Sequence, residues 1–214
     1  MDLIYTIIAF IQEGGIFMYP ILIVFAFGGA ISVERMVFLT SVRGKNRKMW
    51  QKLHPVMVEG DFEQARIMTG EDKSYISQLL GMGLAREGAV RRRDDIEIAM
   101  EESMMEIIPQ LEKRTPYVAL FANISTLLGL LGTIMGLIQA FTAVANANPA
   151  EKADLLSASI SVAMNTTAFG LMAAIPLLII HTYLTSKTGE IIDSLEMASV
   201  KTLNIISEST KRQG

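Results

Sequence analysis

Hydroxyl and amide side chains supply almost all the polar chemistry in the two longest apolar segments of this chain. Between Thr115 and Ala150, and again between Leu155 and Ser186, there is no Asp, Glu, Lys or Arg. The polar groups are Thr, Ser, Asn, a single Gln and one His. Hydroxyls and amides hydrogen-bond an ion or a partner side chain, but they carry no proton at neutral pH. If protons move along these segments, another subunit must supply the acid.

Small and hydroxyl residues recur every three or four positions in both segments, which places them on one face of each expected helix. In the first segment this face contains Thr126, Gly129, Thr133, Gly136 and Ala140, and Gly132 forms a GxxxG pair with Gly136. In the second segment it contains Ser159, Ala163, Thr166 or Thr167, Gly170 and Ala174. Membrane helices associate through such small residues and through side-chain hydrogen bonds.

Two interpretations of these faces stay open. Packing of helices within one chain accounts for the glycines, but less well for a row of hydroxyls, which are useful in a membrane mainly where they meet a partner, water or an ion. We therefore expect an ion-pathway or partner-facing role for the polar members, which are Thr133, Thr167, Thr166, Asn165, Thr126 and Ser159. Helix packing is expected of Gly129, Gly132, Gly136, Ala163, Gly170 and Ala174. A single three-span chain encloses little, so a pore requires several copies in a ring.

Composition identifies the protein class. Half of the 214 residues are hydrophobic, and the mean hydropathy is +0.37. Three stretches, Gly14 to Val33, Pro116 to about Ala145 and about Ser157 to Thr185, reach the roughly 20 apolar residues that a membrane-spanning helix needs. The sequence predicts an all-α integral membrane protein with three transmembrane helices, long helical cytoplasmic extensions and a ring-forming oligomeric state.

The basic residues predict the orientation in the membrane. Of 19 Lys and Arg, 13 lie between Arg43 and Arg114 and four lie between Lys187 and Arg212, whereas the turn between the last two spans contains only Lys152. Positive charge is retained on the cytoplasmic side. We therefore expect a periplasmic N-terminus, a cytoplasmic middle segment and a cytoplasmic C-terminus.

The expected organisation has seven parts. A periplasmic interfacial helix covers residues 1–13, transmembrane helices cover 14–40, 116–146 and 157–186, a cytoplasmic helical domain covers 41–115, a periplasmic turn covers 147–156, and a cytoplasmic helical tail covers 187–214. Within the cytoplasmic domain, Asp61 is a plausible helix cap. Residues 94–114 carry an apolar stripe, formed by Ile96, Met100, Met104, Ile107 and Leu111, on a helix that is expected to run directly into the second span.

Enzymatic chemistry is not expected. The polar part of the sequence contains no nucleophile–base set, metal-ligand cluster or phosphate-binding loop, so we predict no catalytic residue, metal or cofactor. Cysteine is absent, which removes disulfides and thiolate metal sites. The net charge of −3 gives no sign of nucleic-acid binding. Glu34 and Arg35 are expected to form a local pair at the inner headgroups.

Three blocks resemble one known family. Leu127 to Phe141 (LLGLLGTIMGLIQAF) is similar to the second span of the ExbB/TolQ/MotA proton-channel family, and Asn165 to Pro176 (NTTAFGLMAAIP) is similar to its third. Gly14 to Leu39 resembles the first span with its Glu-Arg exit. The order and separation of the blocks also resemble the three-span members with a large cytoplasmic loop.

This resemblance implies a function. Members of the family form a pentamer around two single-span partners of the ExbD or TolR type, each with a membrane Asp, in the bacterial inner membrane. Proton flow down the proton motive force is thought to move the partner and so to drive work at the outer membrane, in some systems through a TonB- or TolA-like protein. By motif, Thr133 and Thr167 would be the threonines that hydrate and hydrogen-bond the partner Asp.

One position departs from the family pattern. Many ExbB and TolQ chains have a Glu five residues before the second threonine, where this chain has Val162. Asn165 and Thr166 add polar groups nearby instead. The branch therefore stays open among nutrient uptake, the Tol-Pal system and a relative that serves another machine such as gliding. The alternative function is a non-conducting scaffold or transport-assembly subunit whose small and hydroxyl faces only pack helices.

Overall fold

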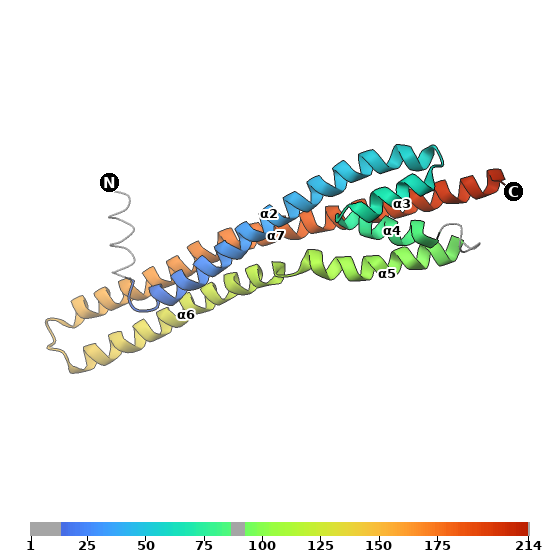
Figure 1. Ribbon diagram of the computed structural model, residues 1–214. Coiled ribbons are helices and arrows are strands. Elements are labelled where there is room, and N and C mark those ends of the chain that lie inside the picture. The colour runs from blue at the N-terminus through green and yellow to red at the C-terminus, as the bar shows by residue number, and fades with distance from the viewer. Residues whose placement is uncertain (1–13, 87–92, 214) are drawn as a thin grey trace, which may run out of the picture. The chain divides into compact units, whose positions relative to one another are not determined.

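The computed structural model describes residues 14–86 and 93–213, and all of its regular elements there are helices (Figure 1). In chain order they are α2 (Met18–Val58), α3 (Phe62–Glu71), α4 (Tyr75–Arg86), α5 (Arg93–Glu112), α6 (Thr115–Asn146) and α7 (Lys152–Gln213). Three of the helical stretches are long and apolar enough to cross a membrane. The predicted all-α membrane fold is confirmed, while the helix expected over residues 1–13 lies outside the described residues.

The described chain divides into two compact units. The first unit contains the residues up to Glu34 together with Arg114–Tyr183, and the second contains Arg35–Lys113 together with the residues from Leu184 onward. The charge-free segments of the sequence therefore fall in the first unit, except for residues 184–186. The second unit contains α3, α4 and α5 in full. Most of the charged residues of the chain belong to this unit.

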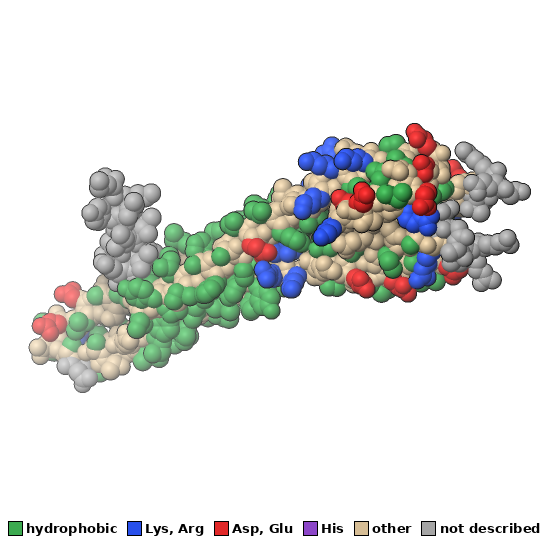
Figure 2. All heavy atoms as spheres, viewed as in Figure 1, with side chains coloured by type: hydrophobic (Ala, Val, Ile, Leu, Met, Phe, Trp, Pro, Cys, Tyr) green, Lys and Arg blue, Asp and Glu red, His purple; other side chains and the backbone are tan. Residues whose placement is uncertain are grey.

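Large apolar side chains cover the surface of the first unit. Phe27, Leu127, Phe141, Met164 and Ile179 are each at least 60% exposed, and Figure 2 shows hydrophobic groups gathered over this part of the molecule. A water-soluble monomer rarely presents so large a continuous apolar surface. The exposed side chains are those that lipid or other apolar helices cover in a multi-pass membrane protein.

The second unit has an apolar core of its own. Every member of the apolar stripe predicted on α5 is buried, which confirms that prediction: Ile96, Met100, Met104, Ile107 and Leu111 are all under 9% exposed. Helix α4 packs on α5 and contributes the fully buried Leu79, Leu80 and Leu84. Asp61 caps α3 as expected, since its Oδ1 accepts a hydrogen bond of 2.9 Å from the Gln64 N–H.

Asn46 and Asp72 fix the ends of α3 and α4 in the second unit. The Ile76 N–H donates to Asn46 Oδ1 at 3.4 Å, which ties α4 to α2. Asp72 accepts from the Ser74 N–H at 2.7 Å and from the Ser77 hydroxyl at 2.9 Å. Burial acts to raise the pKa of Asp72, but these hydrogen bonds and Lys45 outweigh burial and hold that pKa below its ordinary value.

The prediction that α5 runs into the second span is wrong. Helix α5 ends at Glu112, and Arg114 has a left-handed backbone with φ 68° before α6 begins at Thr115. Pro116 lies in the first turn of α6, where its missing N–H costs nothing, whereas in the interior of a continuous helix it would remove a hydrogen bond.

Glu34 and Arg35 each have a partner outside α2. Arg35 is only 3% exposed, donates to the Leu111 carbonyl and lies 4.6 Å from the centre of the Phe38 ring. Glu34 pairs with Arg114 at 3.5 Å. Neighbouring residues of a helix point about 100° apart, so the two side chains reach different parts of the structure.

Helices α6 and α7 make their closest approach at two glycines. A Cβ placed on Gly170 would lie 2.7 Å from the Ser125 carbonyl oxygen and 3.0 Å from Gly129 Cα. A Cβ on Gly129 would lie 3.2 Å from Gly170 Cα. These neighbours are backbone atoms, so no side-chain rotation makes room, and the two helices touch only because both residues lack a side chain.

We therefore expect Gly170→Ala to force α6 and α7 apart and to destabilise the protein by about 1–3 kcal/mol. The measurement is the thermal midpoint of the purified protein in detergent. The matched control is Gly189→Ala on the same helix, where a Cβ meets nothing within 4 Å. This substitution should stabilise the helix by about 0.5–1 kcal/mol, because alanine loses less backbone entropy than glycine on folding. Equal midpoints for the two variants would contradict the close approach.

Candidate functional site

The hydroxyls of Thr133 and Thr167 meet between α6 and α7. The two side chains lie within hydrogen-bonding distance of each other, and each also lies within hydrogen-bonding distance of the Gly129 carbonyl, at 3.2 Å from Thr133 and 2.9 Å from Thr167. Because each hydroxyl has one proton, one threonine donates to the other while the second donates to the carbonyl. Thr133 also reaches the Ala163 carbonyl at 3.4 Å. The absence of side chains at Gly129 and Gly170 lets the two hydroxyls come this close.

Thr133 and Thr167 keep spare hydrogen-bonding capacity. Each hydroxyl has one proton and two acceptor lone pairs, and the backbone carbonyls around them can only accept. Both residues are half-buried, neither sealed inside the unit nor fully exposed. The pair can therefore accept a hydrogen bond from an incoming donor, such as a water molecule or a protonated carboxyl group.

Thr166 lies on a different side of α7 from Thr167. Its hydroxyl donates to the Gly14 carbonyl at 2.6 Å and to its own helix at the Val162 carbonyl, at 3.0 Å, and the residue is 2% exposed. The sequence left open which of the two adjacent threonines shares a face with Thr133. The structure brings Thr167 to Thr133 and buries Thr166 against the segment that precedes α2.

The other three polar candidates are not part of the hydroxyl pair. Thr126 is exposed on α6 and donates to the Ala122 carbonyl one turn back, at 3.2 Å. Asn165 and Ser159 are half-buried on α7, and neither has a hydrogen bond among the described residues. These three side chains are available to a partner or to water, but the fold of one chain does not bring them to Thr133.

The small residues form the contact that holds the pair. Gly129, Gly132, Ala163, Gly170 and Ala174 are buried, and Gly136 is half-buried. A Cβ on Gly132 would lie 2.4 Å from Thr166 Cγ2, and one on Gly136 would lie 2.7 Å from Ala163 Cβ. The stripe predicted on α6 therefore packs against α7 over two turns, on both sides of Thr133.

Sequence reasoning missed Ser125. This residue is fully buried, its hydroxyl donates to the Phe121 carbonyl at 2.9 Å, and its own carbonyl lies against Gly170. The signal was present, because Ser125 precedes Gly129 by four residues and so shares its face of α6. A second small residue at that position extends the close contact by one turn.

Few charged groups lie among the described residues of the first unit. Among its described residues the acidic and basic side chains are Glu34, Arg114, Glu151, Lys152 and Asp154. The residues that the structure describes contain no group of three or more His, Cys, Asp or Glu that could hold a metal. Among the described residues, the chemistry of the Thr133–Thr167 pair is therefore hydrogen bonding, with no acidic or basic side chain of the chain beside it.

A family model described as the MotA/TolQ/ExbB proton channel family matches residues 71–197, which is more than half of the chain. The matched range includes α5, α6 and the part of α7 that carries Thr167. It therefore includes both sides of the contact between α6 and α7.

Individual proteins are also similar to this chain. A putative biopolymer transport protein ExbB homolog of Methanothermobacter thermautotrophicus is 25% identical over 194 residues, which are 90% of this chain and 67% of that protein. The Tol-Pal system protein TolQ of Haemophilus influenzae is 36% identical over 93 residues, 44% of this chain and 40% of TolQ. The putative biopolymer transport protein ExbB-like 3 of Synechocystis is 26% identical over 172 residues, 78% of this chain and 80% of that protein.

The hydroxyl pair predicts a measurable coupling between α6 and α7. In a double-mutant cycle of Thr133→Val and Thr167→Val, we expect a coupling energy of about 0.6–1.7 kcal/mol, the range measured for hydrogen bonds between membrane helices. Thermal or denaturant unfolding of the four proteins in detergent gives this energy. Additive effects of the two substitutions would show that the hydroxyls do not interact.

Proposed function

Because this chain belongs to the MotA/TolQ/ExbB proton channel family, we propose that it is the ring-forming subunit of a proton-driven motor in a bacterial inner membrane. Several copies, five by analogy with the family, surround a dimer of a single-span protein of the ExbD or TolR type. The partner's membrane Asp carries the proton, and its movement does work at the outer membrane. The chain itself is a channel subunit, not an enzyme.

The observation that carries this proposal is the Thr133–Thr167 pair in spans without any charged residue. An ionised carboxylate is costly in the membrane unless it is hydrated or hydrogen-bonded. A half-buried pair of hydroxyls gives a carboxyl group partners in both of its states, because a hydroxyl donates to the carboxylate and accepts from the carboxylic acid. In residues 115–150 and 155–186 the chain has no acid, so we assign the proton carrier to the partner.

The proposed direction of transport follows from the positive charge. The second unit carries 17 of the 19 Lys and Arg, and the first unit carries the other two, Arg114 and Lys152. This bias supports a cytoplasmic second unit and a periplasmic turn between α6 and α7. Protons would enter beside that turn and leave on the side of the second unit. The driven system is nutrient uptake through a TonB-like protein, the Tol-Pal system through a TolA-like protein, or a related process.

A scaffold without ion flux is the second candidate. It is favoured by the same close packing of Gly129 against Gly170, which would hold helices together whether or not anything crosses the membrane. The two candidates differ in what the hydroxyls do. In a scaffold they contribute only the small coupling energy of one hydrogen bond, whereas in a channel they contact the moving acid.

The deciding experiment replaces both hydroxyls while keeping the shape of the side chains. We expect the double variant, Thr133→Val with Thr167→Val, to form complexes of normal composition, as measured by native mass spectrometry. In vesicles that contain the variant and its single-span partner, we expect proton flux to fall at least about tenfold. Loss of one aligned hydrogen-bonding group at a charge-stabilising site typically has an effect of at least this size.

The matched control is Thr182→Val on α7. Its hydroxyl is exposed and donates only to its own helix, at the Leu178 carbonyl, so flux should stay at the level of the unmodified complex. Normal flux in the double valine variant would reject the channel and leave the scaffold. A complex without any acid-bearing single-span partner would reject it as well.

A further inference from the structure

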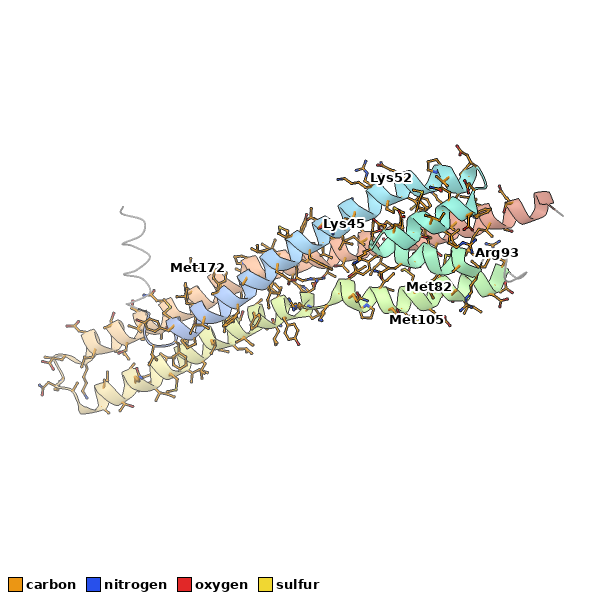
Figure 3. The ribbon with its side chains drawn as sticks, viewed as in Figure 1. Lys45, Lys52, Met82, Arg93, Met105 and Met172 are labelled. Atoms are coloured by element: carbon orange, nitrogen blue, oxygen red, sulfur yellow. The ribbon has the colours of Figure 1, made fainter. Side chains whose placement is uncertain are left out.

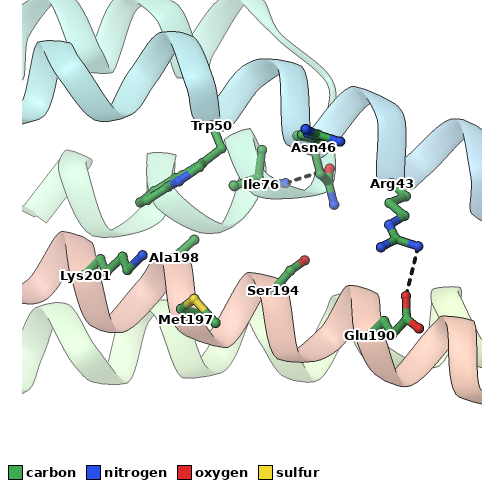
Figure 4. Close-up of a pocket in the computed structure, with 10 residues that line it drawn as sticks. Arg43, Asn46, Trp50, Ile76, Glu190, Ser194, Met197, Ala198 and Lys201 are labelled. Atoms are coloured by element: carbon green, nitrogen blue, oxygen red, sulfur yellow. Dashed lines mark hydrogen bonds and ion pairs between the residues drawn. The ribbon is translucent and has the colours of Figure 1, made fainter.

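A groove with an apolar floor and a basic rim lies between α2 and α7 in the second unit. Its volume is about 350 Å³, and Figure 4 shows the α2 and α7 residues facing each other across it. The floor includes Trp50, Ile76, Met197 and Ala198. Met197 is 57% exposed although it is a large apolar residue. An exposed apolar floor of this kind is typical of the centre of a protein–protein contact.

The rim of the groove has an excess of positive charge. Arg43, Arg47 and Lys201 face one acid, Glu190, which is already paired with Arg43 at 2.9 Å. Neither Arg47 nor Lys201 has an ion pair among the described residues. Asn46 adds a buried side-chain amide whose nitrogen has no hydrogen-bond partner. The groove therefore suits a surface with an apolar centre and negatively charged borders.

The outer face of α5 has this composition. Ile98 is 48% and Met105 is 72% exposed, and Figure 3 shows Met105 pointing away from the helix bundle. The two residues are two turns apart, and Glu101 and Glu102 lie between them, one on each side of the ridge. Glu102 is 3.9 Å from Arg86, whereas Glu101 has no ion pair among the residues that the structure describes. Arg93 is the single basic residue within α5.

We propose that the outer face of α5 of one copy docks into the α2–α7 groove of the next copy around the ring. The Ile98–Met105 ridge would cover Trp50 and Met197, and the glutamates beside the ridge would meet Arg47 and Lys201. The ridge and the α2 side of the groove, Arg43 to Trp50, each contain eight residues, whose ends are about 10 Å apart along the helix. A small free anion would neutralise the rim but leave the apolar floor and the ridge exposed.

The occupant is a second copy because one chain cannot make this contact with itself. In the second unit, α2 runs along one edge and α5 along the opposite edge (Figure 1), and α5 is held there by its buried face. Each copy thus presents a groove on one side and a ridge on the other. Such a heterologous contact closes into a ring when the rotation between copies is right. This inference rests on the proposed ring.

The test uses cysteine cross-linking of the full chain in its membrane, since the sequence contains no cysteine of its own. Met105→Cys and Met197→Cys are made as separate variants and as one double variant, and isolated membranes are oxidised. We expect disulfide-linked dimers when the two single variants are co-expressed, and none when either is expressed alone. The double variant should give a ladder of linked chains that stops at the number of copies in the ring.

The cross-links have a matched control and clear contrary outcomes. Met82→Cys replaces another exposed methionine, on α4 and outside both surfaces, and should form no dimer with Met197→Cys. Absence of the Met105–Met197 dimer from rings of normal size would overturn the proposal. Dimers of Met105→Cys alone would overturn it too, because they require like faces to meet.

Charge reversal tests the rim separately. Glu101→Lys with Glu102→Lys should lower the cross-linking yield about tenfold, as should Arg47→Glu with Lys201→Glu, because like charges then face each other. The four reversals in one chain should restore the yield, since every contact regains opposite charges. Lys48→Glu with Lys52→Glu, exposed cations of α2 outside the groove, should leave it unchanged. A fourfold variant that assembles as poorly as the two pairs would contradict the docking.

The same membranes separate this inference from the proposed function. Normal proton flux without the Met105–Met197 link would reject the docking surface and keep the channel. A complete ladder from complexes that pass no protons would keep the docking surface and reject the channel.

Discussion

The backbone contact between Gly129 and Gly170 is the constraint on which the first unit depends. With no side chain on either residue, α6 and α7 approach until the hydroxyls of Thr133 and Thr167 lie within hydrogen-bonding distance of the Gly129 carbonyl and of each other. The same approach turns Thr166 toward Gly14. A methyl group at either glycine would meet backbone atoms of the facing helix, and separating the helices would weaken the contact between the two hydroxyls.

In the proposed function, a pair of hydroxyls with no acid beside it among the described residues would divide the work of a proton-driven machine between two proteins. A ring whose spans hold only neutral polar groups can assemble in the membrane without the cost of burying charge. In the proposed function, the charge arrives with the partner and meets hydroxyls whose donors and acceptors are already positioned. Preorganised dipoles of this kind stabilise a charge without having to reorient as it forms.

The second unit is organised around two opposite faces of α5. Its buried face packs on α4, and the Leu111 carbonyl near its C-terminal end accepts a hydrogen bond from the buried Arg35, which also stacks on Phe38. A cation near the C-terminus of a helix is favourable because the last carbonyls have no partners within the helix. This interaction fixes the end of α5, and the outer face with its exposed methionine and glutamates is held rigid for an external contact.

The amino-acid sequence by itself determined the class of the protein, its three spans and the face of each helix that carries small and polar residues. These properties follow from local rules, namely hydrophobic length and the 3.6-residue period, and so do the cap at Asp61 and the buried stripe of α5. Only the tertiary structure decided which of two adjacent threonines meets Thr133, because Thr166 and Thr167 differ by 100° of helix rotation and the choice depends on the neighbouring helix. It also decided that Arg35 is buried, since that residue donates to the Leu111 carbonyl, far away in the sequence. The separation of α5 from α6 at the left-handed Arg114 became visible only in the structure, although Pro116 beside it is a local signal.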